Sequence, residues 1–369
     1  MLAAHLLTER GVGAQVFEGT EGLAPAPRTL IVTSRMRDLL GPLGGQAVVN
    51  EIRRFELFTD GRVATVPLQR PDLVIERATL IRGLAQQAEA SGSRILLGRR
   101  FMSLEPTSRA LTFTVVRGQG GALEEERART VIGADGAFSQ VACAAGWPGQ
   151  SAVPLAQAVV GQPKDLRPDT TRVWFAPEET PYFYWLIPES PDRGVVGLIG
   201  EDGQATRQCL ERFLERRGLE PLEFQGARIP LYTGWVPIHR QVGGGYVYLV
   251  GDAAAHVKVT TVGGIVTGFR GALGVAEAVL NGGSSHHFRV LRRELDLHLL
   301  IRRVLHQFTQ REYSRLLDLL TIPAQRSLGS YTRDEAYKLL WRLCLGQPRL
   351  LLLGLRSLLT NGSFPRRRD

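Results

Sequence analysis

The sequence contains little cysteine, and its cysteines form no pattern. Cys143, Cys209 and Cys344 are the only three in 369 residues, and they lie far apart. A disulfide framework needs more cysteines, and a CxxC metal site needs a close pair. We therefore expect a protein of a reducing compartment with no metal site.

Long hydrophobic runs are also missing. No stretch reaches the roughly 18 to 20 apolar residues that a membrane-spanning helix needs. The nearest run, 350–359, is interrupted by Gly354 and Arg356. We interpret this run as a terminal core helix, with membrane contact as the alternative. The N-terminus lacks the basic start and apolar centre of a signal peptide. The sequence therefore predicts a cytoplasmic protein and leaves peripheral contact with a membrane open.

Basic residues are numerous but not clustered. The formal net charge is +9, yet the arginines are spread along the chain, and the one run of three is 366–368. Nucleic-acid binding draws on clustered Lys and Arg, which release counterions from the phosphates. The aromatic residues do not interleave with basic runs. We interpret the charge as a solvated surface and expect no nucleic-acid partner.

The N-terminal segment has the pattern of a helix followed by a strand. Leu2, Leu6 and Leu7 share one helical face, the helix ends by Gly11, and AQVFE reads as a short buried strand. In a dinucleotide-binding βαβ unit, a strand and a GxGxxG turn precede such a helix. That half is absent, although Glu18 stands where an acidic residue accepts hydrogen bonds from the adenosine ribose. We expect a chain truncated at its N-terminus, with a fold built without its first strand as the alternative.

The middle of the chain alternates between strands and helices. Residues 39–73 and 153–200 predict short antiparallel strands in an excursion that covers the substrate. Between them, residues 80–88 have helical spacing. Arg77, at the entrance to that helix, is a candidate flavin contact, and a surface arginine is the alternative. The segments LTFTVVRG and RARTVIGADG predict a hairpin, and the chain is expected to be mostly helical from Ile265 onward.

Two turns carry the pattern of a flavin site. In YVYLVGDAAAHVKVTTVGGI, an apolar strand brings Asp252 to its end, and a glycine-rich turn with Gly263 and Gly264 then begins a helix. An aspartate can accept a hydrogen bond from a ribityl hydroxyl, glycines allow close backbone approach, and a helix start favours anionic groups. The second turn, GADG, places Asp135 and Gly136 after another apolar strand. A plain αβ connection with a glycine cap is the structural alternative.

Both motifs, in this order, resemble those of the superfamily of FAD-dependent hydroxylases and prenyl reductases. Within it, VKVTTVGGI is most similar to the VKPTTGGGI run of the geranylgeranyl reductase family, and FYWLIP resembles the YxWxFPK segment of that family. The resemblance implies that Glu18 meets the adenosine ribose, that Asp135 and Gly136 lie near FAD, and that Asp252 binds the ribityl chain. It places Gly263, Gly264 and Ile265 against the isoalloxazine edge.

The resemblance also suggests substrate and proton-donor residues. Phe183, Trp185 and Pro188 would form a hydrophobic strand on the substrate side of the flavin, with core packing as the alternative. His256 is the candidate catalytic proton donor, although a lone histidine is more often structural. Lys258 would neutralise reduced flavin or phosphate, with a solvated lysine as the alternative.

The sequence departs from the family pattern at several positions. The GxGxxG turn is missing, Val259 replaces a proline, Val262 replaces the first of three glycines, and Glu189 stands where the family has lysine. Val262 puts a side chain where the backbone should approach the flavin ring. These departures concern the catalytic site and leave the expected fold unchanged.

The expected fold class is α/β (α+β). It consists of an N-terminally truncated, Rossmann-like three-layer FAD-binding domain with an inserted antiparallel-sheet substrate domain and a helical C-terminus. The expected domains are 1–38, 74–150 and 240–285 for FAD, 39–73 and 151–239 for substrate, and 286–369 for the helical region.

The expected activity is FAD-dependent reduction of geranylgeranyl carbon-carbon double bonds in a lipid or pigment. NAD(P)H or another external donor would supply the electrons. The alternatives are a flavin-dependent aromatic monooxygenase or halogenase, and a degenerate homologue without catalysis. The partner would be a hydrophobic prenyl chain, and the sequence leaves the oligomeric state open.

Overall fold

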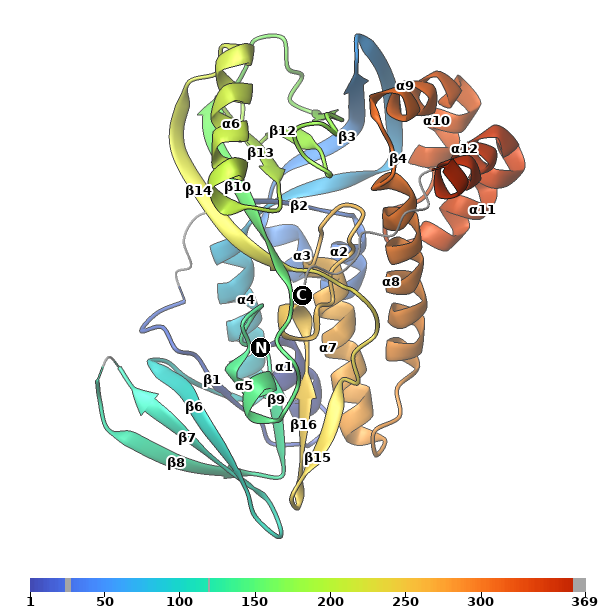
Figure 1. The fold of residues 1–369 in the computed structure, drawn as a ribbon. Helices are drawn as coiled ribbons and strands as arrows, with labels where there is room; N and C mark the ends of the chain where they lie inside the picture. Colours follow the sequence, from blue (N-terminus) through green and yellow to red (C-terminus); the bar gives the residue numbers. More distant parts are fainter. Residues whose placement is uncertain (24–27, 119, 361–369) are drawn as a thin grey trace. The chain divides into compact units, whose positions relative to one another are not determined.

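The computed structural model describes residues 1–23, 28–118 and 120–360, and it divides into two compact units (Figure 1). The first comprises residues 1–48, 75–152 and 228–296. The second comprises residues 49–74, 153–227 and those from 297 onward. Both units are therefore built from segments that are separated in the sequence.

The first unit holds most of the residues expected to bind FAD. Its elements are α1 (Leu2–Thr8), β1 (Gln15–Phe17), β2 (Thr29–Val32), α2 (Arg35–Leu40), α3 (Pro42–Gln46), α4 (Arg77–Ala90), β5 (Arg94–Leu96), β6 (Arg99–Pro106), β7 (Leu111–Arg117), β8 (Leu123–Ala128), β9 (Thr130–Gly133), α5 (Gln140–Ala144), β15 (His239–Val242), β16 (Gly245–Leu249), the 3₁₀ helix η1 (Gly251–Ala254) and α7 (Ile265–Leu280). Helix α8 (His286–Leu305) begins in this unit and ends in the second.

Helices α1, α4 and α7 pack together in the first unit. The apolar face predicted for α1 is buried through Leu2 and Leu7. Helix α4 begins where Glu76 accepts hydrogen bonds from the amides of Ala78 and Thr79 at 2.8 and 2.6 Å. A side-chain cap of this kind satisfies amides that have no partner inside the helix. Local capping and the apolar stripe therefore account for the position of this helical layer.

Apart from β2, the strands of the first unit form three sheets among the described residues. Strands β1 and β5 pair in parallel, β9 and β16 pair in parallel with β15 antiparallel at the edge of β16, and β6, β7 and β8 form an antiparallel sheet. The parallel strands are thus divided into two narrow sheets.

The hairpin expected from residues 111–136 is wrong in its second strand. The partner of β7 is β8, while β9 belongs to another sheet as the neighbour of β16. The two strands are separated by Arg129 alone, so the sequence offered no turn signal at which to divide them.

The second unit is built on one large sheet. Its elements are β3 (Val48–Thr59), β4 (Arg62–Glu76), β10 (Ala152–Gly161), β11 (Thr170–Trp174), β12 (Tyr184–Pro188), β13 (Arg193–Ile199), α6 (Gly203–Arg217), β14 (Pro221–Pro230), α9 (Gln310–Leu319), α10 (Ile322–Gly329), α11 (Ala336–Gly346) and α12 (Pro348–Thr360). The sheet to which these strands belong has the order β14-β10-β13-β12-β11-β3-β4-β2. Strands β10, β13, β12 and β11 are antiparallel in succession, and β11 pairs in parallel with β3.

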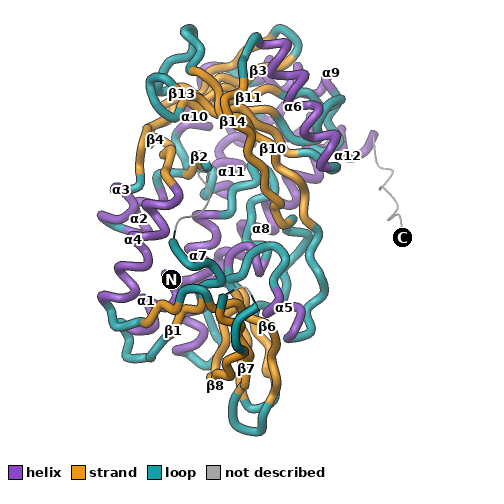
Figure 2. The backbone as a smooth tube through the Cα atoms, turned by 90° about the vertical axis from the view of Figure 1, so that its left-hand side faces the viewer, coloured by secondary structure: helices purple, strands orange, loops and turns teal. Residues whose placement is uncertain are grey.

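The core of the second unit lies between this sheet and α6, which packs on β13 (Figures 1 and 2). Tyr184 stacks on Phe213 of α6, with ring centroids 4.2 Å apart, and Leu198 and Leu210 have no exposed surface. Tyr184 belongs to the apolar FYWLIP strand, so one face of that strand is core.

The β3–β4 hairpin turns at Asp60 and Gly61, both of which have positive φ. Two positive φ values are what a two-residue type I′ turn requires, and Asp-Gly is a favoured sequence for it. This turn therefore accounts for the tight connection between β3 and β4.

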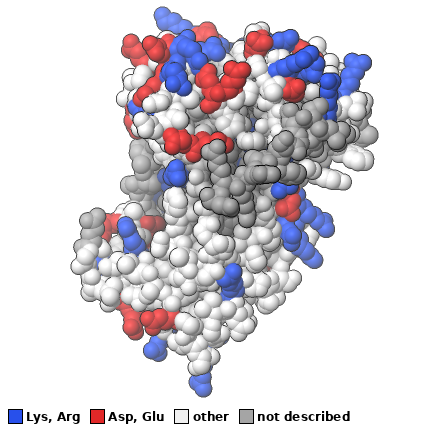
Figure 3. Space-filling view, viewed as in Figure 1, with Lys and Arg blue, Asp and Glu red and all other residues white. Residues whose placement is uncertain are grey.

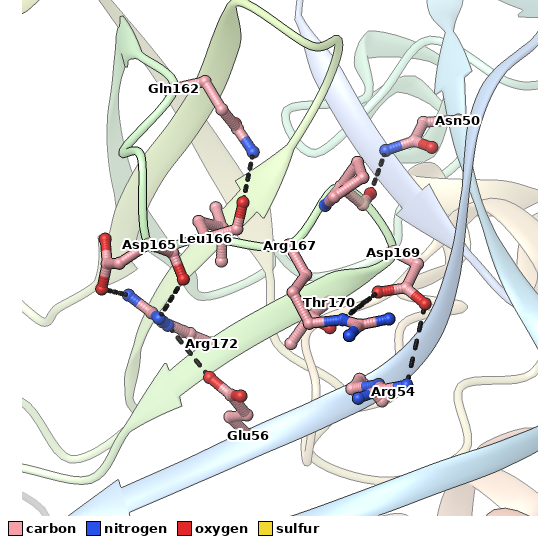
Figure 4. A network of polar contacts seen from close by, with 11 residues as sticks. Asn50, Arg54, Glu56, Gln162, Asp165, Leu166, Arg167, Asp169, Thr170 and Arg172 are labelled. Carbon is pink, nitrogen blue, oxygen red and sulfur yellow. Dashed lines mark hydrogen bonds and ion pairs between the residues drawn. The ribbon is translucent and has the colours of Figure 1, made fainter.

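A polar network fixes the connection between β10 and β11 to β3 (Figure 4). Arg172 donates to Glu56 at 3.0 Å and to Asp165 at 2.8 Å, and its hydrogen bond with Asp165 lowers the pKa of that carboxyl. Asn50 donates to the carbonyl oxygens of Pro168 and Pro188 at 2.8 and 2.9 Å. These contacts hold the start of β11 and the end of β12 against one strand.

The observed fold confirms the expected mixed α/β class with a helical C-terminus. The C-terminal helices, however, group with the sheet of the second unit and do not form a unit of their own. The functional domain boundaries stay a prediction.

Candidate functional site

Asp252 lies in the turn after β16. This turn is the 3₁₀ helix η1, which ends at Ala255 in the left-handed conformation, with φ of 51°. The amide of His256 donates to the carbonyl oxygen of Gly251 at 3.0 Å, and that of Ala255 donates to Asp252 at 3.1 Å. The turn is therefore closed by its own backbone, and it presents the Asp252 carboxylate at the end of a buried strand.

The next segment folds back on itself before α7. The amide of Lys258 donates to the carbonyl oxygen of Gly263 at 3.1 Å, and the Thr267 hydroxyl donates to the carbonyl oxygen of His256. Lys258 is almost fully buried, at 4% exposure. Its Nζ lies 3.8 Å from the point where a Cβ on Gly263 would stand. The buried amine of Lys258 therefore lies directly beside this glycine.

Val262 has φ of +51° and is buried. A β-branched residue in the left-handed region is strained, because its side chain crowds its own backbone. The side chain packs inside the protein, whereas the sequence suggested that it would obstruct the approach to the flavin. The strain at this position follows from replacing the first glycine of the family pattern.

Helix α7 begins at Ile265 with Gly264 as its N-cap, and no side chain caps it among the described residues. The first amides of a helix lack partners inside the helix and attract anions. Asp252 Oδ1 lies 3.1 Å from the point where a Cβ on Gly264 would stand. The helix start and the Asp252 carboxylate therefore share one small site, to which Gly264 gives close backbone access.

Two arginines lie within electrostatic reach of Asp252. The Asp252 side chain reaches the surface. The surrounding protein nevertheless raises the pKa of its carboxyl, while the charges of Arg28 and then Arg77 lower that pKa. Burial lowers the pKa of Arg28, and the neighbouring Arg77 lowers it further, whereas Asp252 raises it. Arg77, predicted as a candidate flavin contact, is thus within electrostatic reach of Asp252.

Arg28 was missed by the sequence analysis. Its Nε is buried with no hydrogen-bond partner among the described residues. A buried donor without a partner is costly and points to a group that it can bind. Arg28 is a single basic residue before a short strand, and only the fold brings it to Asp252, 224 positions away.

Asp135 and Gly136 follow β9, as the sequence predicted. Asp135 accepts hydrogen bonds from the Ser139 hydroxyl and from the amide of Val141 at 3.1 Å, so it stabilises the start of α5. Gly136 has φ of +87°, and no atom lies within 4 Å of the point where a Cβ would stand. Strand β9 pairs with β16, so the two motif turns leave neighbouring parallel strands at the same end.

Glu18 follows β1 and closes a turn. Its carboxylate accepts hydrogen bonds from the amide and the hydroxyl of Thr20, both at 3.0 Å. Burial lowers the pKa of the Met1 amino group, and the charge of Glu18 raises it. The start of α1 and Glu18 therefore lie within electrostatic reach of each other.

His256 is fully buried. Its ring stacks on Trp235 at 5.7 Å, with Phe288 6.2 Å away, and neither ring nitrogen has a partner among the described residues. Burial lowers its pKa to about 3, so the imidazole is neutral at pH 7. The proton-donor role stays a prediction, and the lack of exposed surface favours packing.

Gly271 of α7 leaves room for this imidazole. A Cβ at Gly271 would lie 2.3 Å from His256 Nδ1, which is closer than real side-chain contacts. The histidine therefore fixes the distance between the turn after β16 and the first half of α7.

The predicted substrate residues lie in the second unit. Phe183 contacts Trp185 edge-on at 6.1 Å and Phe175 at 6.3 Å, and Phe175 stacks on Tyr313 at 4.6 Å. Trp185 packs on Gly197 of β13. Pro188 ends β12 and is buried, and its carbonyl oxygen is bound by Asn50. Phe183 and Trp185 thus belong to an aromatic cluster on the face of β12 opposite Tyr184.

These residues fit an FAD molecule. The first unit brings together Arg28, Arg77, Asp252 and the start of α7, which is a set of donors suited to an anionic group beside an acceptor suited to hydroxyls. The unpartnered Nε of Arg28 is the observation that tests this fit. In the described part of the chain, no group of three or more His, Cys, Asp or Glu side chains could hold a metal ion.

Comparison with known proteins shows the family of the chain. The family model of the FAD binding domain matches residues 1–284. The digeranylgeranylglycerophospholipid reductase of Methanothrix thermoacetophila is 31% identical over 304 residues, which are 77% of this chain and 75% of the relative. Reductase 2 of the same name from Methanothermobacter thermautotrophicus is 29% identical over 269 residues, and the match spans 69% of this chain but only 63% of that relative.

A solved structure shares the fold over almost the whole chain. It is the geranylgeranyl bacteriochlorophyll reductase-like protein of Thermoplasma acidophilum, with a TM-score of 0.79 at 16% identity, covering 97% of this chain and 95% of the other. The family model and the sequence relatives confirm the resemblance seen in the motifs. The chain belongs to the geranylgeranyl reductase family of FAD-dependent oxidoreductases.

Proposed function

We propose that this protein reduces carbon-carbon double bonds of a geranylgeranyl or similar isoprenoid chain, with electrons from NAD(P)H or another external donor. FAD, when bound, would supply hydride chemistry that no protein side chain offers. The protein would supply binding, orientation and charge. The family membership supports the proposal. So do the names of the relatives, which are those of prenyl-lipid reductases.

The observation that carries the proposal is the placement of Asp252 beside Gly264 at the start of α7, with Arg28 nearby. Asp252 would accept a hydrogen bond from the ribityl chain. The backbone at Gly263, Gly264 and Ile265 would lie along the flavin ring, where Lys258 supplies a positive charge.

The other residues would hold the rest of the cofactor and the substrate. Glu18 would bind the adenosine ribose, and Asp135 and Gly136 would lie near the cofactor. The aromatic cluster of Phe183 and Trp185 would contact the prenyl chain, since aromatic side chains offer a large apolar surface with few rotatable bonds. This surface suits a substrate that carries no charge along its length.

The test is FAD titration of the full chain, followed by anaerobic reduction and incubation with a geranylgeranyl-bearing lipid. We expect FAD to bind and the product to gain two hydrogen atoms for each reduced bond, as measured by mass spectrometry. Asp252→Asn should weaken FAD binding, whereas Asp192→Asn, in an exposed loop, should not.

Two results would overturn the proposal. Incorporation of oxygen into an aromatic substrate would identify a monooxygenase on the same fold. A chain that folds but binds no FAD at saturating concentration would be a non-catalytic homologue.

A further inference from the structure

The last two helices expose large apolar side chains. On α11, Tyr337 is 73% exposed and Trp341 is 62% exposed, and on α12, Leu351 and Leu352 are 47% and 63% exposed. Scattered exposed apolar residues are normal on a protein surface. Here, however, four lie on two adjacent helices of 11 and 13 residues that pack against each other.

Other residues of the same two helices face inward and are buried. Leu343 of α11 packs against a cluster around Leu317 and Ala324, and Leu353 of α12 packs against Phe308 and Tyr313. These contacts hold the helices on the second unit. Because the inward side is already satisfied, the exposed Trp, Tyr and Leu side chains are not needed for attachment to that unit.

The charges on the two helices have one sign. Between residues 336 and 360 the sequence contains Lys338, Arg342, Arg349 and Arg356 but no Asp or Glu. Lys338 forms an ion pair with Glu335 at 3.0 Å, and Arg342 donates to the Tyr331 hydroxyl at 3.3 Å. Arg342 and Arg349 keep this surface basic even where Glu335 offsets the charge of Lys338. By contrast, Figure 3 shows acidic and basic side chains together where Figure 1 draws α6.

The sequence spacing of the exposed residues places them in two rows along α11. Residues four apart lie on the same face of a helix, so Tyr337 lies above Trp341 and Lys338 above Arg342. An aromatic stripe therefore runs beside a basic stripe along α11. Tryptophan and tyrosine favour the boundary between lipid and water, and lysine and arginine favour anionic headgroups.

No helix among the described residues is both long and apolar enough to cross a bilayer. Short amphipathic helices with aromatic and basic residues lie flat in the headgroup region. A second copy of the chain fits this surface less well, because a symmetric contact would bring the same positive charges together. We propose that α11 and α12 form a membrane-binding surface that docks this protein on an anionic lipid bilayer.

The proposal goes beyond the enzymatic function and does not depend on it. The first test is co-sedimentation of the full chain with vesicles of phosphatidylcholine alone or mixed with phosphatidylglycerol. We expect binding to the anionic vesicles that weakens with added salt, and little binding to the neutral ones. Equal affinity for the two vesicle types, or no binding to either, would overturn the proposal.

Matched variants locate the surface. Leu352→Gln should weaken binding severalfold, whereas Leu222→Gln should not, since Leu222 on β14 is equally exposed at 63%. Arg349→Gln should weaken binding to anionic vesicles by about fivefold, the effect of one basic residue at such a surface. Arg109→Gln, exposed in the β6–β7 turn, is its control. Equal effects of variants and controls would overturn the assignment to α11 and α12.

Fluorescence gives a second readout. Trp147, Trp174 and Trp185 are at most 9% exposed, whereas Trp341 is 62% exposed. Vesicles with brominated acyl chains should therefore quench the wild-type protein more than Trp341→Phe. Analytical ultracentrifugation tests whether a second copy of the chain covers this face instead. A dimer that Leu352→Gln dissociates would show that it does, and would overturn the proposal.

Discussion

Arg270 on α7 and Glu294 on α8 form a buried ion pair, with Nη1 and Oε2 2.6 Å apart and side-chain exposures of 6% and 11%. The pair lies five residues after the first residue of α7, the helix whose start forms part of the candidate FAD site. It ties that helix to α8. The position of the helix start therefore depends on a contact away from the site itself.

Breaking this pair should cost much more than breaking an exposed one. Arg270→Met removes one partner of this buried ion pair, which typically costs about 3 to 5 kcal/mol. Arg292→Met removes the neighbouring exposed pair with Asp296, which should cost less than about 1 kcal/mol. Urea unfolding of both variants measures the difference. Equal losses would show that the buried pair adds nothing to the free energy of unfolding.

Replacing Val262 with glycine should be unusually well tolerated. Val262→Gly loses buried apolar surface but relieves the strain of a valine at φ of +51°, which is worth about 1 to 3 kcal/mol. We expect a net change within about 1 kcal/mol. Val259→Gly, at 3% exposure in the same loop, gains no such relief and should lose about 2 to 4 kcal/mol. Thermal unfolding compares the two, and a larger loss for Val262→Gly would contradict the strain argument.

Arg28 should contribute to FAD affinity. Because its Nε has no protein partner among the described residues, Arg28→Met would remove a charged donor from the site, and we expect a dissociation constant for FAD raised by about tenfold or more. Arg82→Met, on the exposed side of α4, is the control. Flavin fluorescence titration measures both affinities. An unchanged affinity for Arg28→Met would remove this residue from the site.

His256 should make the free energy of unfolding depend on pH. The folded state lowers its pKa from 6.5 to about 3, so between these values the unfolded state binds more protons. The contribution of His256 to the free energy of unfolding is therefore fully present above pH 6.5 and is lost as the pH falls toward 3. The contribution of this group is about 1.4 kcal/mol per pH unit within that window.

Denaturant titrations at pH 7 and pH 5 measure this slope. His256→Leu should reduce it, whereas His286→Leu, on the exposed start of α8, should leave the contribution of His256 in place. If His256→Leu had the wild-type slope, the buried imidazole would not be its source.

The local parts of the fold could be predicted from the sequence. The strand before Asp252, the turn and the start of α7 are contiguous, so apolar pattern and glycine placement were sufficient to find them. The capped start of α4 beside Arg77 was found in the same way. Short antiparallel strands were predicted for residues 39–73, but the structure has a helix, α3, at Pro42–Gln46 and then two long strands, β3 and β4.

Contacts distant in the sequence were not accessible. Arg28 comes within electrostatic reach of Asp252 only because of the fold, and no local pattern marks it. The boundary between β8 and β9 was missed because it depends on which sheet each strand joins. The burial of Lys258 and His256 could likewise not be predicted from the sequence, since α7 and Trp235 decide it.

The contact between Gly271 and His256 has an evolutionary consequence. Any side chain at position 271 would overlap the imidazole, because a Cβ there falls 2.3 Å from Nδ1. The two positions should therefore change together among relatives: a residue larger than glycine at 271 is compatible only with a smaller residue at 256. Substituting Gly271→Ala alone should impair folding, and adding His256→Ala should restore it.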